Sequence, residues 1–126
     1  MKQISGGVTA PQGFQAIGVA AGIKKPGRKD MAMVYSEKEC RVAGTFTTNV
    51  VKAAPVKWDQ QIVYGNKTAH AVVVNSGVAN ACTGTEGYGY CEQMAACTGE
   101  KLGIPKESVL VASTGVIGRQ LPIDTI

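Results

Sequence analysis

Aromatic residues, histidine and closely spaced cysteines are scarce in this sequence. Aromatic side chains make up 6% of the 126 residues and are scattered, so we expect no stacking platform for nucleic acid. The cysteines include no C-x-x-C pair and His70 is the only histidine, so we expect no metal site. The four cysteines are Cys40, Cys82, Cys91 and Cys97.

The sequence also lacks a strong charge of one sign and a long apolar run. Thirteen Lys and Arg against nine Asp and Glu give a net charge of +4, too mild and too evenly spread to imply a nucleic-acid partner. Glutamines and glycines interrupt the uncharged stretch 3–23, so it predicts neither a signal peptide nor a membrane span. We therefore expect no membrane partner, a cytoplasmic location and reduced thiols.

Glycine, in contrast, is abundant. It occupies 16 of the 126 positions, which favours short elements joined by tight turns over a bundle of long helices. Apolar residues make up 44%, enough for one core in a chain of this length. Strands come early and a helix late, with little βαβ alternation. This order predicts an α/β (α+β) layered sandwich with a mixed sheet.

Apolar patterning predicts most of the elements. Residues 85–102 should form a helix with Cys91, Met94 and Ala95 on its buried face, ended by Gly103. Residues 55–58 read as an extended segment, with Asp59 capping a short helix through residue 64. Proline and an acid at 121–126 predict the opening of a further helix. Strands are expected at residues 15–22, 30–36, 41–48, 70–75 and 109–112.

The sharpest motif is STGVIG at residues 113–118, directly after a predicted buried strand. A turn of this kind can bring the Thr114 hydroxyl and backbone N–H groups together to stabilise an oxyanion. The same donors could hold a phosphate. An ordinary glycine turn between a strand and a helix explains the spacing as well. The pattern is not a P-loop, because no Gly-Lys-Ser/Thr follows.

A second motif, NSGVANACTG at residues 75–84, follows another buried strand. It could form the wall of a site, or it could be a loop held by asparagine bonds to the backbone. Ser76 or Cys82 could be the nucleophile of a self-sufficient hydrolase, although the sequence offers no recognisable base for either residue.

The one basic cluster consists of Lys24, Lys25, Arg28 and Lys29. It is either a solvated turn or an anion-binding patch. Together with STGVIG, that patch would make a non-catalytic small-ligand or phosphate-binding domain.

Seven blocks along the chain carry a family resemblance. They are VTAPQGF at 8–14, GVAAGIK at 18–24, KDMA at 29–32, GTFTTN at 44–49, KAAPV at 52–56, NSGVANACTG at 75–84 and VASTGVIG at 111–118. In this order they resemble the ornithine acetyltransferase family, also called bifunctional glutamate N-acetyltransferase. Val78 is a departure, since the family usually has asparagine at this position.

The resemblance implies a ping-pong transfer of acetyl from N-acetylornithine to glutamate, in arginine biosynthesis. In the family, a precursor cleaves itself before a threonine that becomes the nucleophile and the first residue of the β chain. Carried over to this sequence, the oxyanion hole is formed by the hydroxyl of Thr114 and the N–H of Gly115. The nucleophile and the main substrate contacts of the family lie beyond Ile126. The resemblance implies no cofactor, apart from acetyl-CoA as a second acetyl donor in bifunctional members.

The resemblance also sets expectations for the architecture and the partner. The family fold resembles that of N-terminal-nucleophile enzymes, and its α and β chains assemble into an α2β2 heterotetramer. Residues 1–126 are thus expected to be the N-terminal, α-chain part of the enzyme, truncated at its C-terminus and active only with its β chain.

Overall fold

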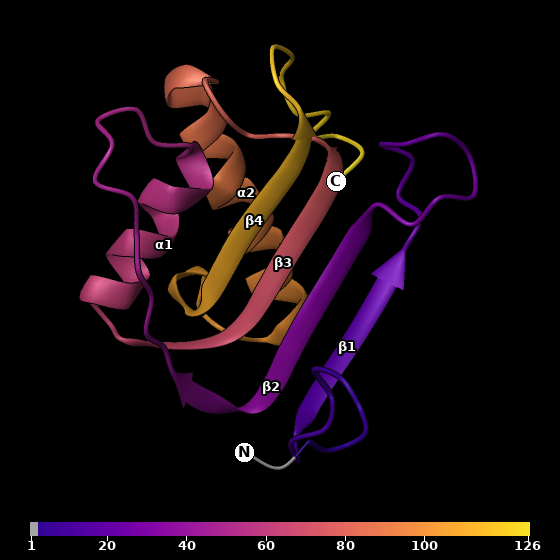
Figure 1. The fold of residues 1–126 in the computed structure, drawn as a ribbon, viewed down its shortest axis with the longest axis vertical. Helices are drawn as coiled ribbons and strands as arrows, with labels where there is room; N and C mark the ends of the chain where they lie inside the picture. Colours follow the sequence, from indigo (N-terminus) through magenta and orange to yellow (C-terminus); the bar gives the residue numbers. More distant parts are fainter. Residues whose placement is uncertain (1–2) are drawn as a thin grey trace.

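A four-stranded mixed sheet carries two helices in the computed structural model, which describes residues 3–126 (Figure 1). The sheet has the order β1-β2-β3-β4: β1 and β2 are antiparallel, β2 and β3 are antiparallel, and β3 and β4 are parallel. The predicted layered α+β fold with a mixed sheet is confirmed. The strands are β1 (Phe14–Val19), β2 (Met31–Arg41), β3 (Thr68–Val78) and β4 (Val109–Val116). The helices are α1 (Ala54–Tyr64) and α2 (Gly84–Leu102), with a 3-10 turn at Lys106–Ser108.

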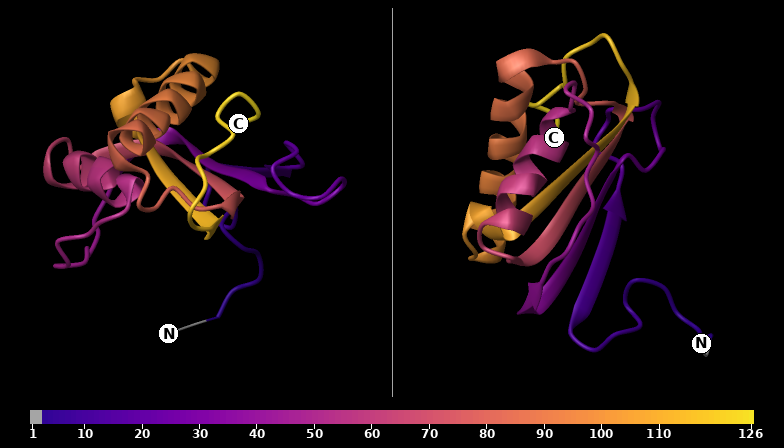
Figure 2. Two further views of the ribbon diagram at one scale, coloured as in Figure 1. Left: turned by 90° about the horizontal axis from the view of Figure 1, so that it is seen from above. Right: turned by 60° about the vertical axis from the view of Figure 1, so that its left-hand side comes forward.

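Both helices pack on the same face of the sheet, over β3 and β4 (Figure 2). The core lies in this layer: Val109, Val111, Cys91 and Ala95 are fully buried there. Trp58 joins the layer from α1, and its indole N–H donates to the carbonyl of Val109 at 2.9 Å. This bond satisfies the one polar group of a side chain that is otherwise buried in apolar surroundings.

The opposite face of the sheet carries no helix of the described chain (Figure 2). Side chains alternate between the two faces along each strand. The register of the four strands therefore places a set of small or branched apolar residues on this face. Its members are Ala16, Gly18, Ala32, Val34, Val72, Val74, Leu110 and Ala112. The same alternation also puts His70, Ser76 and Thr114 on this face, so polar residues lie beyond both ends of the apolar set.

The helix predicted at residues 85–102 is confirmed as α2. Cys91, Met94 and Ala95 are buried on one of its faces, as the helical spacing predicts. Gly103 ends it in the left-handed conformation, with φ of 68° and its N–H bonded to the carbonyl of Gly99.

Two predictions in the middle of the chain are wrong. Residues 55–58 are helical, since α1 begins at Ala54 with Pro55 in its first turn and buries Trp58 and Ile62 one turn apart. Asp59 is therefore inside the helix and caps nothing. Residues 42–48 form no strand; instead β2 runs past its expected end at residue 36 as far as Arg41.

The last residues close one turn. The N–H groups of Thr125 and Ile126 both bond the carbonyl of Pro122, at 2.9 and 3.3 Å. Residues 123–125 form a hydrogen-bonded turn and not a helix, so the predicted helix opening is not confirmed. Leu121, just before it, is 4% exposed and anchors this segment to the core.

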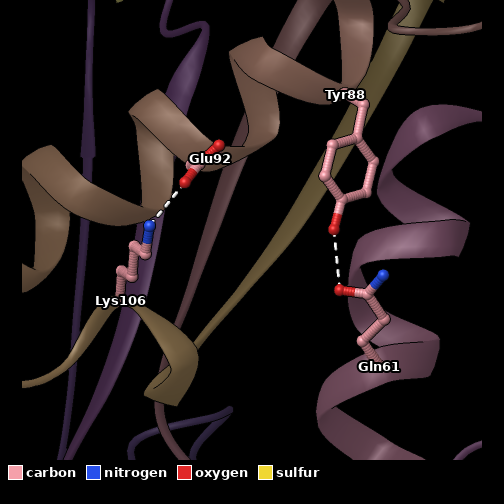
Figure 3. A network of polar contacts seen from close by, with 4 residues as sticks. All are labelled: Gln61, Tyr88, Glu92 and Lys106. Atoms are coloured by element: carbon pink, nitrogen blue, oxygen red, sulfur yellow. Dashed lines mark hydrogen bonds and ion pairs between the residues drawn. The ribbon is translucent and has the colours of Figure 1, made fainter. Parts of the chain in front are cut away.

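Polar contacts join α1, α2 and the 3-10 turn at the surface (Figure 3). The hydroxyl of Tyr88 donates to Oε1 of Gln61 at 2.7 Å, and Lys106 pairs with Glu92. The bond from Lys106 to Glu92 raises the pKa of the lysine. These residues rim a cavity of about 330 Å³ between the helices, whose inner wall includes Trp58.

Asp59 gives this layer a testable pH dependence. Burial raises the pKa of its carboxyl group to about 6, outweighing the Val111 N–H that donates to it at 2.9 Å. Between about pH 4 and pH 6 the folded state therefore binds the proton more tightly than the unfolded state, so stability falls as the pH rises. In wild type we expect the free energy of unfolding to decline by about 2 kcal/mol over this pH range. Asp59→Asn keeps the acceptor oxygen but does not titrate, so it should remove this decline.

Urea denaturation of wild type and Asp59→Asn at about pH 4 and about pH 7 measures this difference. Asp124→Asn, at an exposed position, is the matched control and should keep the wild-type decline. Equal pH dependence in wild type and Asp59→Asn would contradict the assignment.

Candidate functional site

The chemistry-bearing motifs meet at one edge of the sheet. The parallel strands β3 and β4 both end there, at Val78 and Val116. The antiparallel strand β2 begins at the same edge, because Met31 pairs with Asn75, and this brings residues 20–29 alongside. The N-terminus of α2 follows the end of β3 after five residues. The carboxyl ends of parallel strands are the usual place for a ligand site in open α/β sheets.

Thr114 and Gly115 lie at this edge but not in a turn. Both belong to β4, and the chain bends only at residues 117–119, so the predicted strand-to-helix turn at STG is wrong. Pairing with β3 continues as far as Val78 and Val116, which is why the strand runs longer than its apolar part. Both residues are exposed.

Two glycines face each other where these strands end. Gly77 and Gly115 are register partners with φ of 118° and 136°, values that other residues rarely adopt. A Cβ at position 115 would overlap the carbonyl group of Gly77 and lie 2.6 Å from the N of Val78. The positive φ turns the peptide planes away from their orientation in a regular parallel strand. A backbone N–H so turned can serve a ligand instead of the neighbouring strand.

Buried asparagines hold the 75–84 segment. Asn75 is fully buried, donates to the carbonyl of Val78 at 2.8 Å and accepts a bond from the hydroxyl of Ser113. Asn80 donates to the carbonyl of Gly87 at 2.7 Å and accepts from Thr83. Asparagine bonds to the backbone are present as one alternative expected, but residues 75–78 belong to β3, so only residues 79–83 form a loop. Val78, at the position where asparagine was expected, is 3% exposed and part of the core.

The side of the sheet taken by each site residue follows from these bonds. Asn75 and Ser113 meet on the helix-covered side. By alternation, the next register pair, Ser76 and Thr114, points to the open side.

The residues of the basic cluster differ in their exposure. Lys25, Arg28 and Lys29 are exposed around the turn, but Lys24 is half-buried and its ammonium donates to Oγ of Ser76 at 2.6 Å. Ser76 thus has a basic partner that sequence spacing did not reveal, since 52 residues separate the two.

Asp30 organises this side of the site and was missed by the sequence reading. It is 3% exposed, and its carboxylate accepts the N–H groups of Ala21, Gly22 and Lys24 at 2.7 to 3.2 Å. The bond from the Lys24 N–H is the largest cause of a pKa below the usual aspartate value. The only signal in the sequence was an acid at the end of a basic, glycine-containing turn.

The cysteines near the site differ in exposure. Cys82 is exposed and has a φ of 58° in the bend before α2. Cys91 is buried on α2, where desolvation raises the pKa of its thiol to about 12, so it is a poor nucleophile. A cavity of about 180 Å³ next to Cys82 connects the two loops of the site. Its lining is Ala81, Cys82, Thr83, Gly118, Arg119 and Gln120.

Within residues 3–126, no three His, Cys, Asp or Glu side chains gather as metal ligands. No helix in the same range is long and apolar enough to cross a membrane.

Comparison with known proteins identifies the family. The family model described as "ArgJ family" matches residues 15–126. The arginine biosynthesis bifunctional protein ArgJ 1 of Clostridium acetobutylicum is 56% identical, over 90% of this chain and 28% of that protein. The arginine biosynthesis bifunctional protein ArgJ of Thermotoga neapolitana is 53% identical, over 92% of this chain and 29% of that protein. The chain thus spans less than a third of these curated relatives.

Two solved structures share the fold. The crystal structure of ArgJ from Bacillus halodurans has a TM-score of 0.89 and 42% identity, over 95% of this chain and 62% of that one. Ornithine acetyltransferase from Mycobacterium tuberculosis, solved in complex with ornithine, has a TM-score of 0.84 and 46% identity, over 94% and 64%. From the family match and these structures together, the chain belongs to the ArgJ family.

Proposed function

We propose that this chain is the N-terminal, α-chain part of an autoprocessed acetyltransferase of arginine biosynthesis, which moves acetyl from N-acetylornithine to glutamate. The observation that carries the proposal is the end of β4, where Thr114 and Gly115 lie exposed and Gly115 faces Gly77. Relatives named as arginine biosynthesis proteins, and one named as an ornithine acetyltransferase, support the substrate class.

The transfer proceeds in two steps. A threonine Oγ of the partner chain attacks the acetyl carbonyl of N-acetylornithine, giving a tetrahedral intermediate with a negatively charged oxygen. The amide C–N bond then breaks, ornithine leaves with a proton, and the acetyl group remains as an ester on the threonine. The amine of glutamate attacks that ester and restores the threonine hydroxyl. The N-terminal amine of the partner chain acts as the base.

Thr114 and Gly115 are the proposed donors to the charged oxygen. The hydroxyl of Thr114 and the N–H of Gly115 are neighbours in sequence and lie on a strand that the sheet holds rigid. Donors that are fixed before the reaction need no rearrangement as the charge develops, which makes each of them effective.

The uncovered face of the sheet supports the presence of a partner chain. The apolar residues of the open sheet face and the exposed Val116 and Ile117, at 59% and 61%, adjoin the proposed donors. Exposed apolar surface beside a site favours burial by another layer. We propose that the β chain of the same precursor provides it, in an α2β2 heterotetramer.

The lengths of the relatives support cleavage of a precursor. Nearly the same segment amounts to 62% of the Bacillus chain but only 29% of the Thermotoga protein, so the crystallised chain is about half as long. A precursor cut into two chains of similar length would give this ratio.

The test is the intact mass of the complete protein under denaturing conditions. We expect two polypeptides, the second beginning with threonine, and a single uncut polypeptide when that threonine is replaced by alanine. The unreplaced protein should also gain the mass of one acetyl group on the second polypeptide when N-acetylornithine is added without glutamate. A single uncut polypeptide that still transfers acetyl would contradict the proposal.

A further inference from the structure

The contact between Lys24 and Ser76 joins two loops that are far apart in the sequence. The ammonium of Lys24 lies 2.6 Å from Oγ of Ser76, which is the register partner of Thr114. Neighbouring strands of a sheet lie about 4.8 Å apart, so register partners on one face have adjacent side chains. The positive charge of Lys24 is therefore held one side chain away from Thr114.

The surrounding structure fixes Lys24 at both ends. Its N–H donates to the buried carboxylate of Asp30 at 2.8 Å, and its aliphatic stem lies over Gly77, where a Cβ would come within 3.0 Å of it. The N–H of Ser76 donates to the carbonyl of Asp30 at 2.7 Å, which ties both partners to the same residue. Such support from neighbouring groups is typical of a functional side chain.

The charge of Lys24 has no carboxylate partner in the part of the chain that the structure describes. The one ion pair within residues 3–126 joins Lys106 to Glu92, and Lys106 directly precedes the start of β4, whereas Thr114 lies near its end. The carboxylate of Asp30 accepts the backbone N–H groups of Lys24, Ala21 and Gly22, and the ammonium of Lys24 bonds Ser76 instead. A half-buried cation that forms no direct ion pair favours negative charge that develops next to it.

We propose that Lys24 is a positioning residue for the acetyl transfer: through Ser76, its ammonium supplies positive charge to the proposed oxyanion site at Thr114 and Gly115. This inference rests on the function proposed above. The charge acts most strongly when the oxygen of the intermediate becomes negative, so Lys24 should affect turnover more than substrate binding.

The test is Lys24→Met in the complete enzyme, because methionine keeps the unbranched stem over Gly77 and removes only the ammonium. We expect kcat to fall about tenfold or more, less than for the loss of a direct donor, with KM for both substrates within about twofold. Lys24→Arg should recover most of the loss, since it restores the charge. Lys101→Met, an exposed lysine on α2, is the matched control and should leave turnover unchanged.

Ser76→Ala tests whether Lys24 affects turnover through its contact with Ser76. If Lys24 acts through Ser76, the double variant Lys24→Met/Ser76→Ala should be no slower than the slower single variant. Fully multiplicative losses would overturn the inference, and so would a rise in KM at unchanged kcat, which would make Lys24 a substrate contact. An effect of Lys24→Met that Lys24→Arg does not relieve would also overturn it, since it would reflect packing.

Failure of this inference and failure of the proposed function give different results. If Thr114→Ala slows turnover and Lys24→Met does not, only the role of Lys24 is refuted. If Thr114→Ala leaves turnover unchanged, the oxyanion assignment itself fails, and the role of Lys24 with it.

Discussion

Gly115→Ala is expected to lower the free energy of unfolding by about 3 kcal/mol or more and to abolish acetyl transfer. The added methyl group would overlap the carbonyl group of Gly77 and approach the N of Val78 to 2.6 Å. These are backbone atoms of a paired strand, so they cannot move aside as a flexible side chain would. The φ of 136° adds strain, because alanine rarely adopts it.

Gly89→Ala is the matched control. Gly89 lies inside α2, a Cβ there would meet nothing within 4 Å, and alanine is the better helix former. We expect it to leave activity unchanged and to stabilise the protein by up to about 1 kcal/mol. Urea denaturation of the complete protein compares the three forms. If Gly115→Ala and wild type have the same urea midpoint, the added methyl group does not lower stability, and the expected clash with Gly77 is contradicted.

Thr114→Ala is expected to leave the protein folded and to reduce kcat by about 10²- to 10³-fold, the usual loss for one oxyanion donor. Thr114 is exposed, so the change removes little buried surface and should not affect stability. Thr114→Ser keeps the hydroxyl and should retain most of the activity. Steady-state kinetics with N-acetylornithine and glutamate measures both variants.

The matched control is Thr68→Ala, at the opposite end of β3. Its hydroxyl bonds only the exposed Glu39, so we expect turnover to stay at the wild-type level. Thr114→Ala with wild-type kcat would refute the oxyanion assignment. A loss of activity in Thr114→Ser as large as in Thr114→Ala would instead point to a role for the methyl group.

The parts of the fold that depend on local pattern were predictable. Helix α2 follows from apolar residues at helical spacing and from Gly103, which can adopt the left-handed end conformation. Strand β4 follows from its apolar run, though its extension through Thr114 to Val116 depends on pairing with β3. Helix α1 was not predictable, because its short apolar segment with Pro55 fits an extended strand until Trp58 has a core to enter.

By itself, the sequence determined the family, the mixed sheet, the long helix and the assignment of Thr114 and Gly115 as the residues to test. Each of these depends on residues that are neighbours along the chain or on blocks whose order is preserved. Only the tertiary structure decided that Lys24 lies on Ser76, that Asp30 holds the loop of Lys24, and that Gly115 faces Gly77. These contacts join distant segments, and strand pairing and packing create them, so no local pattern of residue types could have indicated them.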